Sequence, residues 1–152
     1  MPPRIDFYVS EDAGADTRMR LACRVTEKAY LAQQKIVVLF DDADSLRRFD
    51  ELLWTFGDGS FVPHDTVSAP GARCDAPVAL TTGPLPADSF FDTEGSVLIN
   101  LAGAVPPFFE RFARVVESLD ARPDVRTAGR ERFKTYRARS IEPQTHNVRG
   151  DG

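Results

Sequence analysis

Runs of apolar residues along the chain mark the strands of a sheet that is covered on both faces. Residues 35–40 read Lys-Ile-Val-Val-Leu-Phe, and such a continuous β-branched run is typical of a central strand in a parallel sheet. Residues 5–9 predict an earlier strand. Further candidate strands lie at residues 61–62, 77–82 and 96–101. The pattern therefore predicts a sheet of about five strands.

Apolar positions at intervals of three and four residues predict helices between these strands. The first covers residues 16–34, and a second follows a run of aspartates at residues 41–44 that offers an amino-terminal cap and ends near Trp54. Two prolines at 106–107 are typical of a helix start. Behind them lies an apolar stripe of Phe108, Phe109, Phe112, Val115, Val116 and Leu119. A last helix is expected at residues 123–139.

Strands that alternate with helices predict an α/β fold. We expect a three-layer sandwich, a Rossmann-like arrangement in which helices cover both faces of a mostly parallel sheet. The chain has 152 residues, which suits one domain, placed at residues 1–139. Residues 82–95 are expected to form a surface loop. Residues 140–152 are polar and end in Gly-Asp-Gly, which predicts a flexible tail.

The charge balance argues against DNA binding by the molecule as a whole. The formal net charge is −4 and the isoelectric point about 5.2, so the overall field repels a phosphate backbone. Residues 122–139 differ, because seven Lys or Arg side chains minus two Asp or Glu give a local charge of +5. Direct binding of single-stranded DNA by this segment stays an open alternative.

Cysteine usage and hydropathy favour a cytoplasmic protein. Cys23 and Cys74 are far apart in the chain and lack the spacing of a zinc site or a disulfide framework. No apolar run approaches the roughly 18 residues that a membrane span needs, and the amino terminus lacks the apolar segment of a secretion signal. We expect no membrane association and no bound metal.

Catalytic chemistry finds little support in the sequence. A Rossmann-like sheet invites a nucleotide, but the turn at residues 10–16 holds only Gly14 and three acidic residues, and no glycine-rich phosphate motif occurs. Asp41 could bind a ribose, although a helix cap explains it more simply. His64 beside Asp65 could act as a general base, yet no nucleophile is near. We predict no catalytic residue and no cofactor, and a nucleotide-dependent enzyme is the alternative.

A pair of aromatic residues is the first candidate interaction site. A helical wheel puts Trp54 about 80° from Leu46, at the edge of the buried stripe. The glycine-rich turn that follows could place Phe61 beside it. Tryptophan is a frequent anchor of protein interfaces, whereas the plainer interpretation is that Trp54 closes the rim of the core.

The last helix carries the second candidate site. Its inner side is expected to hold Val125, Ala128, Gly129 and Tyr136, and another side gathers Arg126, Arg130, Phe133 and Arg137, with Lys134 just beyond. Guanidinium groups beside an aromatic ring suit a ligand that is both acidic and apolar, such as a peptide that ends in an aromatic residue with its free carboxylate. Leu119, at the end of the preceding helix, is expected to form the floor. A merely solvated basic face is the alternative.

Two segments resemble signatures of the chi subunit of bacterial DNA polymerase III. Leu53-Trp54 followed by Ser-Phe-Val-Pro-His at residues 60–64 is similar to the central signature, and Gly-Arg-Glu-Arg-Phe-Lys-Thr-Tyr-Arg at residues 129–137 is similar to the carboxy-terminal one. The resemblance extends from Phe7 to Arg137. It departs from the family pattern at Leu119, Arg126 and Phe133, where Val, Lys and Tyr are expected, but each substitution keeps the physical role.

The resemblance implies an adaptor of the replication machinery that has no activity of its own. It would link the clamp loader, through its psi subunit, to the C-terminal acidic-aromatic tail of single-stranded DNA-binding protein, and so meet DNA only indirectly. Trp54 and Phe61 would face psi or a helicase-like repair protein. The tail would dock on residues matching Leu119, Arg126, Arg130 and Phe133, which agrees with the site on the last helix.

Overall fold

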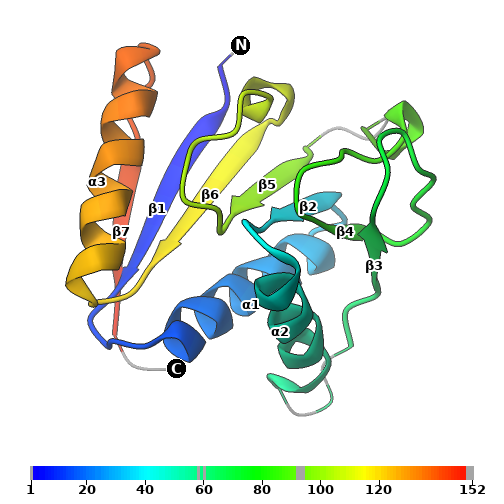
Figure 1. The fold of residues 1–152 in the computed structure, drawn as a ribbon, viewed down its shortest axis with the longest axis horizontal. Coiled ribbons are helices and arrows are strands. Elements are labelled where there is room, and N and C mark those ends of the chain that lie inside the picture. Colours follow the sequence, from blue (N-terminus) through cyan, green and yellow to red (C-terminus); the bar gives the residue numbers. More distant parts are fainter. Residues whose placement is uncertain (1, 58, 60, 92–94, 150–152) are drawn as a thin grey trace.

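A parallel sheet with the strand order β3-β4-β2-β5-β6-β1-β7 lies at the centre of the protein (Figure 1). The computed structural model describes residues 2–57, 59, 61–91 and 95–149, and within these residues the sheet has seven strands. The strands are β1 Arg4–Ser10, β2 Ile36–Leu39, β3 His64–Val67, β4 Val78–Thr81, β5 Val97–Asn100, β6 Arg114–Leu119 and β7 Gln144–Val148. The predicted α/β sandwich is confirmed, with more strands than the expected five or so.

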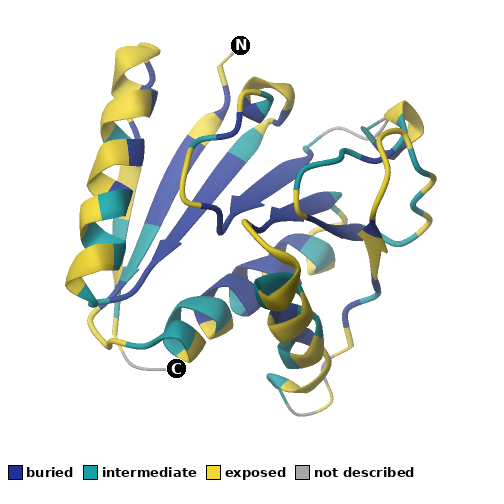
Figure 2. Cartoon of the chain, in the orientation of Figure 1, coloured by how far each residue is buried: buried dark blue, intermediate teal, exposed yellow. Residues whose placement is uncertain are grey.

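Helices cover both faces of this sheet. Helices α1 (Ala15–Leu31) and α2 (Ala43–Thr55) pack on one face, and α3 (Pro123–Ala138) packs on the other with two short 3-10 helices, η1 (Asp88–Phe91) and η2 (Phe109–Arg111). Because successive side chains of a strand point to opposite faces, β2 contributes Ile36 and Val38 to one core and Val37 and Leu39 to the other. The central strands are therefore buried between two helical layers, whereas the edge strands β3 and β7 keep exposed residues (Figure 2).

The prediction of a helix after Pro106 and Pro107 is wrong for most of that segment. Only the 3-10 helix η2 forms there, and the chain continues as strand β6. Strand β6 fills the place between β5 and β1, with five of its six residues buried. A strand covered on both faces needs no alternation of apolar and polar residues. The apolar residues of β6, together with those of η2, therefore also fitted the spacing expected of a helix. Leu119 thus ends a strand rather than a helix.

Two smaller expectations also fail, for strand positions near the sheet edges. Residues 61–62 form no strand, and the edge strand β3 begins only at His64. Residues 144–148, expected in a flexible tail, form strand β7, which pairs with β1 from Asp6↔Gln144 to Ser10↔Val148. Strand β7 is polar and is held by main-chain hydrogen bonds and by stacking of His146 on Tyr8 at 4.8 Å, so hydropathy could not reveal it.

A buried polar network fixes α3 on the sheet. Arg132 Nε donates to Glu117 Oε1 over 2.8 Å, and the Tyr136 hydroxyl and Asn100 Nδ2 donate to Glu117 Oε2 over 2.7 and 2.9 Å. Arg132 Nη1 also donates to the Gly103 carbonyl oxygen at 3.1 Å. Burial, and then the neighbouring Glu117 carboxylate, raise the pKa of Tyr136. The phenol therefore stays a donor, and the network sets the position of the helix.

Candidate functional site

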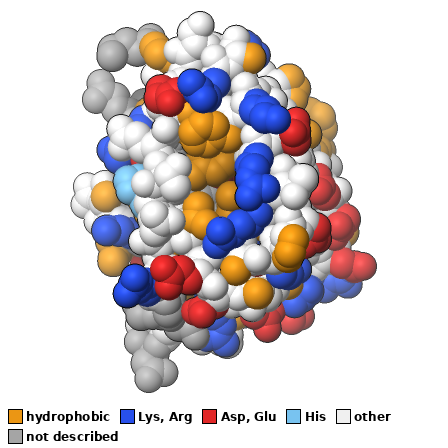
Figure 3. Space-filling model, turned by 90° about the vertical axis from the view of Figure 1, so that its left-hand side faces the viewer, with side chains coloured by type: hydrophobic (Ala, Val, Ile, Leu, Met, Phe, Trp, Pro, Cys, Tyr) orange, Lys and Arg blue, Asp and Glu red, His pale blue; other side chains and the backbone are white. Residues whose placement is uncertain are grey.

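A hollow between α3 and the edge of the sheet formed by β6, β1 and β7 is the first candidate site, called the α3 basin here. Its volume is about 300 Å³. Its lining combines apolar side chains with a cationic rim and consists of Phe7, Val9, Leu119, Gly129, Arg130, Phe133, Lys134, Arg137 and Thr145. Figure 3 looks onto this side of the molecule and shows hydrophobic surface in a hollow bordered by Lys and Arg side chains.

Close packing of α3 on β6 creates the floor of the α3 basin. A Cβ atom added at Gly129 would lie 2.6 Å from Leu119 Cδ1 and 2.9 Å from Cδ2. Only glycine therefore allows the helix backbone to approach Leu119 this closely without displacing its methyl groups. Phe133 is half-buried and its ring packs on Phe7 at a centroid distance of 5.2 Å. Phe133 thus forms one wall of the α3 basin.

The cations on the rim remain accessible to a ligand. Arg130 is exposed and makes no ion pair or side-chain hydrogen bond within the described part of the chain. Lys134 pairs with Glu131 at 3.3 Å, and Arg137 with Glu142 at 3.1 Å. Such exposed pairs contribute about 0–1 kcal/mol. An incoming carboxylate can therefore displace them at little cost.

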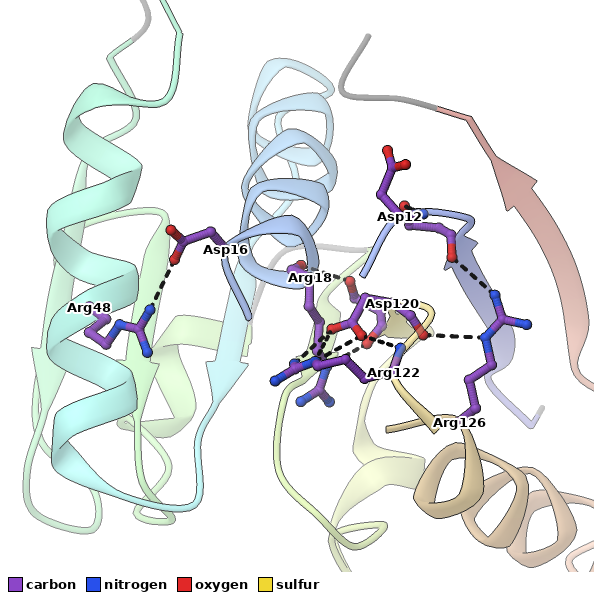
Figure 4. A network of polar contacts seen from close by, with 9 residues as sticks. Asp12, Asp16, Arg18, Arg48, Asp120, Arg122 and Arg126 are labelled. Carbon is purple, nitrogen blue, oxygen red and sulfur yellow. Dashed lines mark hydrogen bonds and ion pairs between the residues drawn. The ribbon is translucent and has the colours of Figure 1, made fainter. Parts of the chain in front are cut away.

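Arg126 differs from the other predicted residues. It does not line the α3 basin, and its guanidinium donates to the carbonyl oxygens of Ser10 at 3.1 Å and Asp120 at 3.3 Å (Figure 4). It lies one helical turn before Arg130, on the same side of α3. The structure therefore brings together five of the six residues predicted for the last helix and its floor, with Arg126 beside them.

Two arginines of the basic segment are committed to partners inside the fold. Arg132 is 3% exposed and pairs with Glu117, and Arg122 forms two-pronged hydrogen bonds to the buried Asp120. Burial would raise the pKa of Asp120, but hydrogen bonds from the Arg122 side chain and backbone outweigh it and lower that pKa. Counting charges in the sequence missed these pairs. The available signal was Glu117 directly after the apolar Val115 and Val116, since a carboxylate next to buried apolar positions indicates a buried partner.

The aromatic pair at Trp54 and Phe61 is the second candidate site. Trp54, near the end of α2, is 45% exposed, and Phe61, before β3, is 62% exposed. Their ring centroids lie 5.2 Å apart. The ring of His64 lies 4.4 Å from that of Trp54 and supports it from the buried side. Large apolar side chains exposed together are typical of a docking surface.

The residues considered for catalysis have structural partners. His64 Nδ1 lies 2.7 Å from the Val62 carbonyl oxygen, and Nε2 lies 2.6 Å from Asp50 Oδ1, so Asp50 rather than Asp65 is its carboxylate partner. Asp41 Oδ2 accepts from the Gly103 amide at 2.9 Å. The cap of α2 is the next residue, Asp42, which accepts from the Ser45 amide at 2.7 Å.

Neither a metal cluster nor a membrane span is found in the described ranges. No group of three or more His, Cys, Asp or Glu side chains there is placed to hold a metal ion. No described helix is both long and apolar enough to cross a bilayer. Cys23 and Cys74 are free thiols.

The fold and the two surfaces define a class of protein. It is a parallel α/β domain with an aromatic pair near the β3 edge of the sheet and a cation-rimmed basin near the β7 edge. The family model described as DNA polymerase III chi subunit, HolC, matches residues 1–144. The chain therefore belongs to this family, whose members are accessory subunits of DNA polymerase III in DNA replication.

Curated relatives agree with this assignment. The DNA polymerase III subunit chi of Pseudomonas aeruginosa is 32% identical over 145 residues, which cover 95% of this chain and 96% of that protein. The subunit chi of Escherichia coli is 27% identical over 83% of this chain and 82% of that protein. The Haemophilus influenzae protein of the same name is 23% identical over 97% and 99%.

Proposed function

We propose that this protein is an adaptor without catalytic activity that links the clamp loader of DNA polymerase III to single-stranded DNA-binding protein. The C-terminal acidic-aromatic tail of that protein would dock in the α3 basin. The psi subunit of the clamp loader would bind the aromatic pair, and a helicase-like repair protein could use the same surface. The observation that carries the proposal is the meeting of Arg130, Phe133, Lys134 and Arg137 over Leu119 in one hollow.

The chemistry of the α3 basin suits an aromatic residue with a free carboxylate. The apolar floor between Phe7, Phe133 and Leu119 would receive the aromatic ring. Arg130 would bind the terminal carboxylate, because a guanidinium forms two parallel hydrogen bonds with a carboxylate. Lys134 and Arg137 would attract the acidic residues that precede it.

Binding of a fluorescent peptide ending in Asp-Ile-Pro-Phe tests this site. Replacing Arg130 by Ala should weaken binding by about 2 kcal/mol or more, roughly a thirtyfold loss in affinity. Arg139→Ala is the matched control, since Arg139 directly follows the last residue of the same helix, is exposed and pairs with Glu110 outside the basin. Removing the final Phe of the peptide should be equally damaging. Equal affinity of the Arg130 variant and the wild type would refute the assignment.

The partner of the aromatic pair is tested separately. Immobilised protein should retain the clamp-loader subunits from an extract of the native organism, and Trp54→Ala should lose them while the tail peptide still binds. Leu31→Ala is the control, because Leu31 is another large apolar residue that is exposed, at 70%. Retention of the clamp loader by the Trp54 variant would exclude this surface.

A further inference from the structure

A second hollow, separate from the α3 basin, lies on the opposite face of the sheet between α1 and the beginning of β1 and β6. It is called the α1 groove here and has a volume of about 410 Å³. Leu21 and Val25 of α1 form an apolar floor, and Val148 of β7 borders it. Neither the predicted interaction residues nor those of the aromatic pair take part in its lining.

The α1 groove gathers positive charge on an acidic protein. Four cationic side chains line it, namely Arg4, Arg24, Lys28 and Arg114, and its described lining includes no Asp or Glu. The buried carboxylate of Asp6 behind it pairs with Arg4 at 3.0 Å and with Arg114 at 2.8 Å, and Arg24 has an interaction of its own. Lys28 is exposed and makes no ion pair among the described residues. With a molecular net charge of −4, this local surplus selects an anionic ligand.

The geometry around Tyr8 narrows the class of ligand. The ring of His146 stacks on Tyr8 at 4.8 Å with an interplanar angle of 24°. The Arg114 guanidinium lies 5.9 Å from the centroid of the same ring and donates to its hydroxyl oxygen at 2.8 Å. Single-stranded nucleic acid is normally held by bases stacked on free aromatic faces, and Tyr8 is already engaged by these neighbours. A carboxylate, by contrast, is bound by hydrogen bonds from guanidinium and ammonium groups and needs no aromatic face.

We propose that the α1 groove binds an acidic peptide segment, with an aliphatic side chain of the segment on the floor at Leu21 and Val25 and its carboxylates on Arg4 and Lys28. This site is independent of the α3 basin. It needs neither an aromatic residue nor a free carboxy terminus in its ligand. The protein would then offer two anion-binding surfaces, one on each face of the sheet.

Heteronuclear NMR with isotope-labelled protein tests the proposal. The probe is the peptide Asp-Asp-Leu-Asp-Asp, acetylated and amidated so that it has no terminal charges and no aromatic ring. Its addition should shift amide signals of residues 21–32 and 4–8. Lys28→Glu should lower the affinity for the peptide by about fivefold, which corresponds to ~1 kcal/mol of binding free energy. Arg20→Glu makes the same charge change on the same helix outside the lining and should leave the affinity within about twofold.

Three results would overturn the proposal. The first is the absence of shifts in the α1 groove at millimolar peptide, or shifts confined to residues around Phe133. The second is an equal loss of affinity for the Lys28 and Arg20 variants, which would indicate only a diffuse charge effect. The third is tighter binding of a short oligothymidylate than of the peptide in this groove, which would assign the surface to nucleic acid. Unchanged spectra of both free variants verify that each is folded.

Discussion

Replacing Glu117 by Gln should destabilise the protein by about 3 kcal/mol or more, because it leaves an unpaired charge in the interior. Glu117 is fully buried and Arg132 is 3% exposed. Arg132 Nη2 already lacks a hydrogen-bond partner among the described residues, so the Glu117 carboxylate is the main compensation for the guanidinium charge. Removing one member of such a buried pair typically costs about 3–5 kcal/mol.

The hydrogen-bond geometry adds to this cost. Both carboxylate oxygens of Glu117 accept from donors, which are Arg132 Nε on one side and the Tyr136 hydroxyl and Asn100 Nδ2 on the other. A glutamine offers one oxygen and one NH₂ group. Its NH₂ must therefore face a donor, whichever way the amide turns, and one buried donor loses its acceptor at about 1–3 kcal/mol.

Urea unfolding of four proteins measures the effect: the wild type, Glu117→Gln, Arg132→Met and the double variant. Methionine keeps an apolar stem in place of the arginine. The double variant removes both charges, so its loss should be smaller than the sum of the single losses by about 2 kcal/mol or more. Equal denaturant slopes verify that the transitions are comparable. Additive losses, or a loss below about 1 kcal/mol for Glu117→Gln, would refute the reasoning.

Two further predictions concern β1 and the α3 basin. Burial raises the pKa of Asp6, but hydrogen bonds from His146 and Arg114 outweigh it and hold that pKa below its ordinary 3.8. Its carboxylate therefore adds stability at neutral pH that is lost as the pH falls below about 4. Asp6→Asn should be less stable at neutral pH and lose less on acidification, and parallel stability profiles for the two proteins would contradict this. Gly129→Ala should weaken the tail peptide by about three- to tenfold because the new methyl group displaces Leu119, with little change in melting temperature since alanine favours the helix. Unchanged peptide affinity would show that Leu119 is not the floor.

The sequence predicted those residues of the α3 basin that lie together on a single helix. Arg130, Phe133, Lys134 and Arg137 follow each other at helical spacing, so a wheel could gather them without knowledge of the sheet. The wheel gave Arg126 the same role, but its guanidinium turns to the carbonyl oxygens of Ser10 and Asp120. Those carbonyls belong to the last residue of β1 and to the residue that follows β6, and no local pattern could place them next to the helix.

The chain by itself determined the α/β class, the central strand β2 and the positions of the three main helices, although α1 ends at Leu31 rather than at residue 34, because hydrophobic periodicity and helix caps are local properties. Tertiary structure alone decided that residues 114–119 form a strand and that residues 144–148 complete the sheet beside β1. It also decided that Arg132 is a buried partner of Glu117 rather than a surface charge. The physical reason is common to all three: strand pairing and charge burial depend on neighbours distant in the sequence, whose hydrogen bonds and screening from water exist only in the assembled fold.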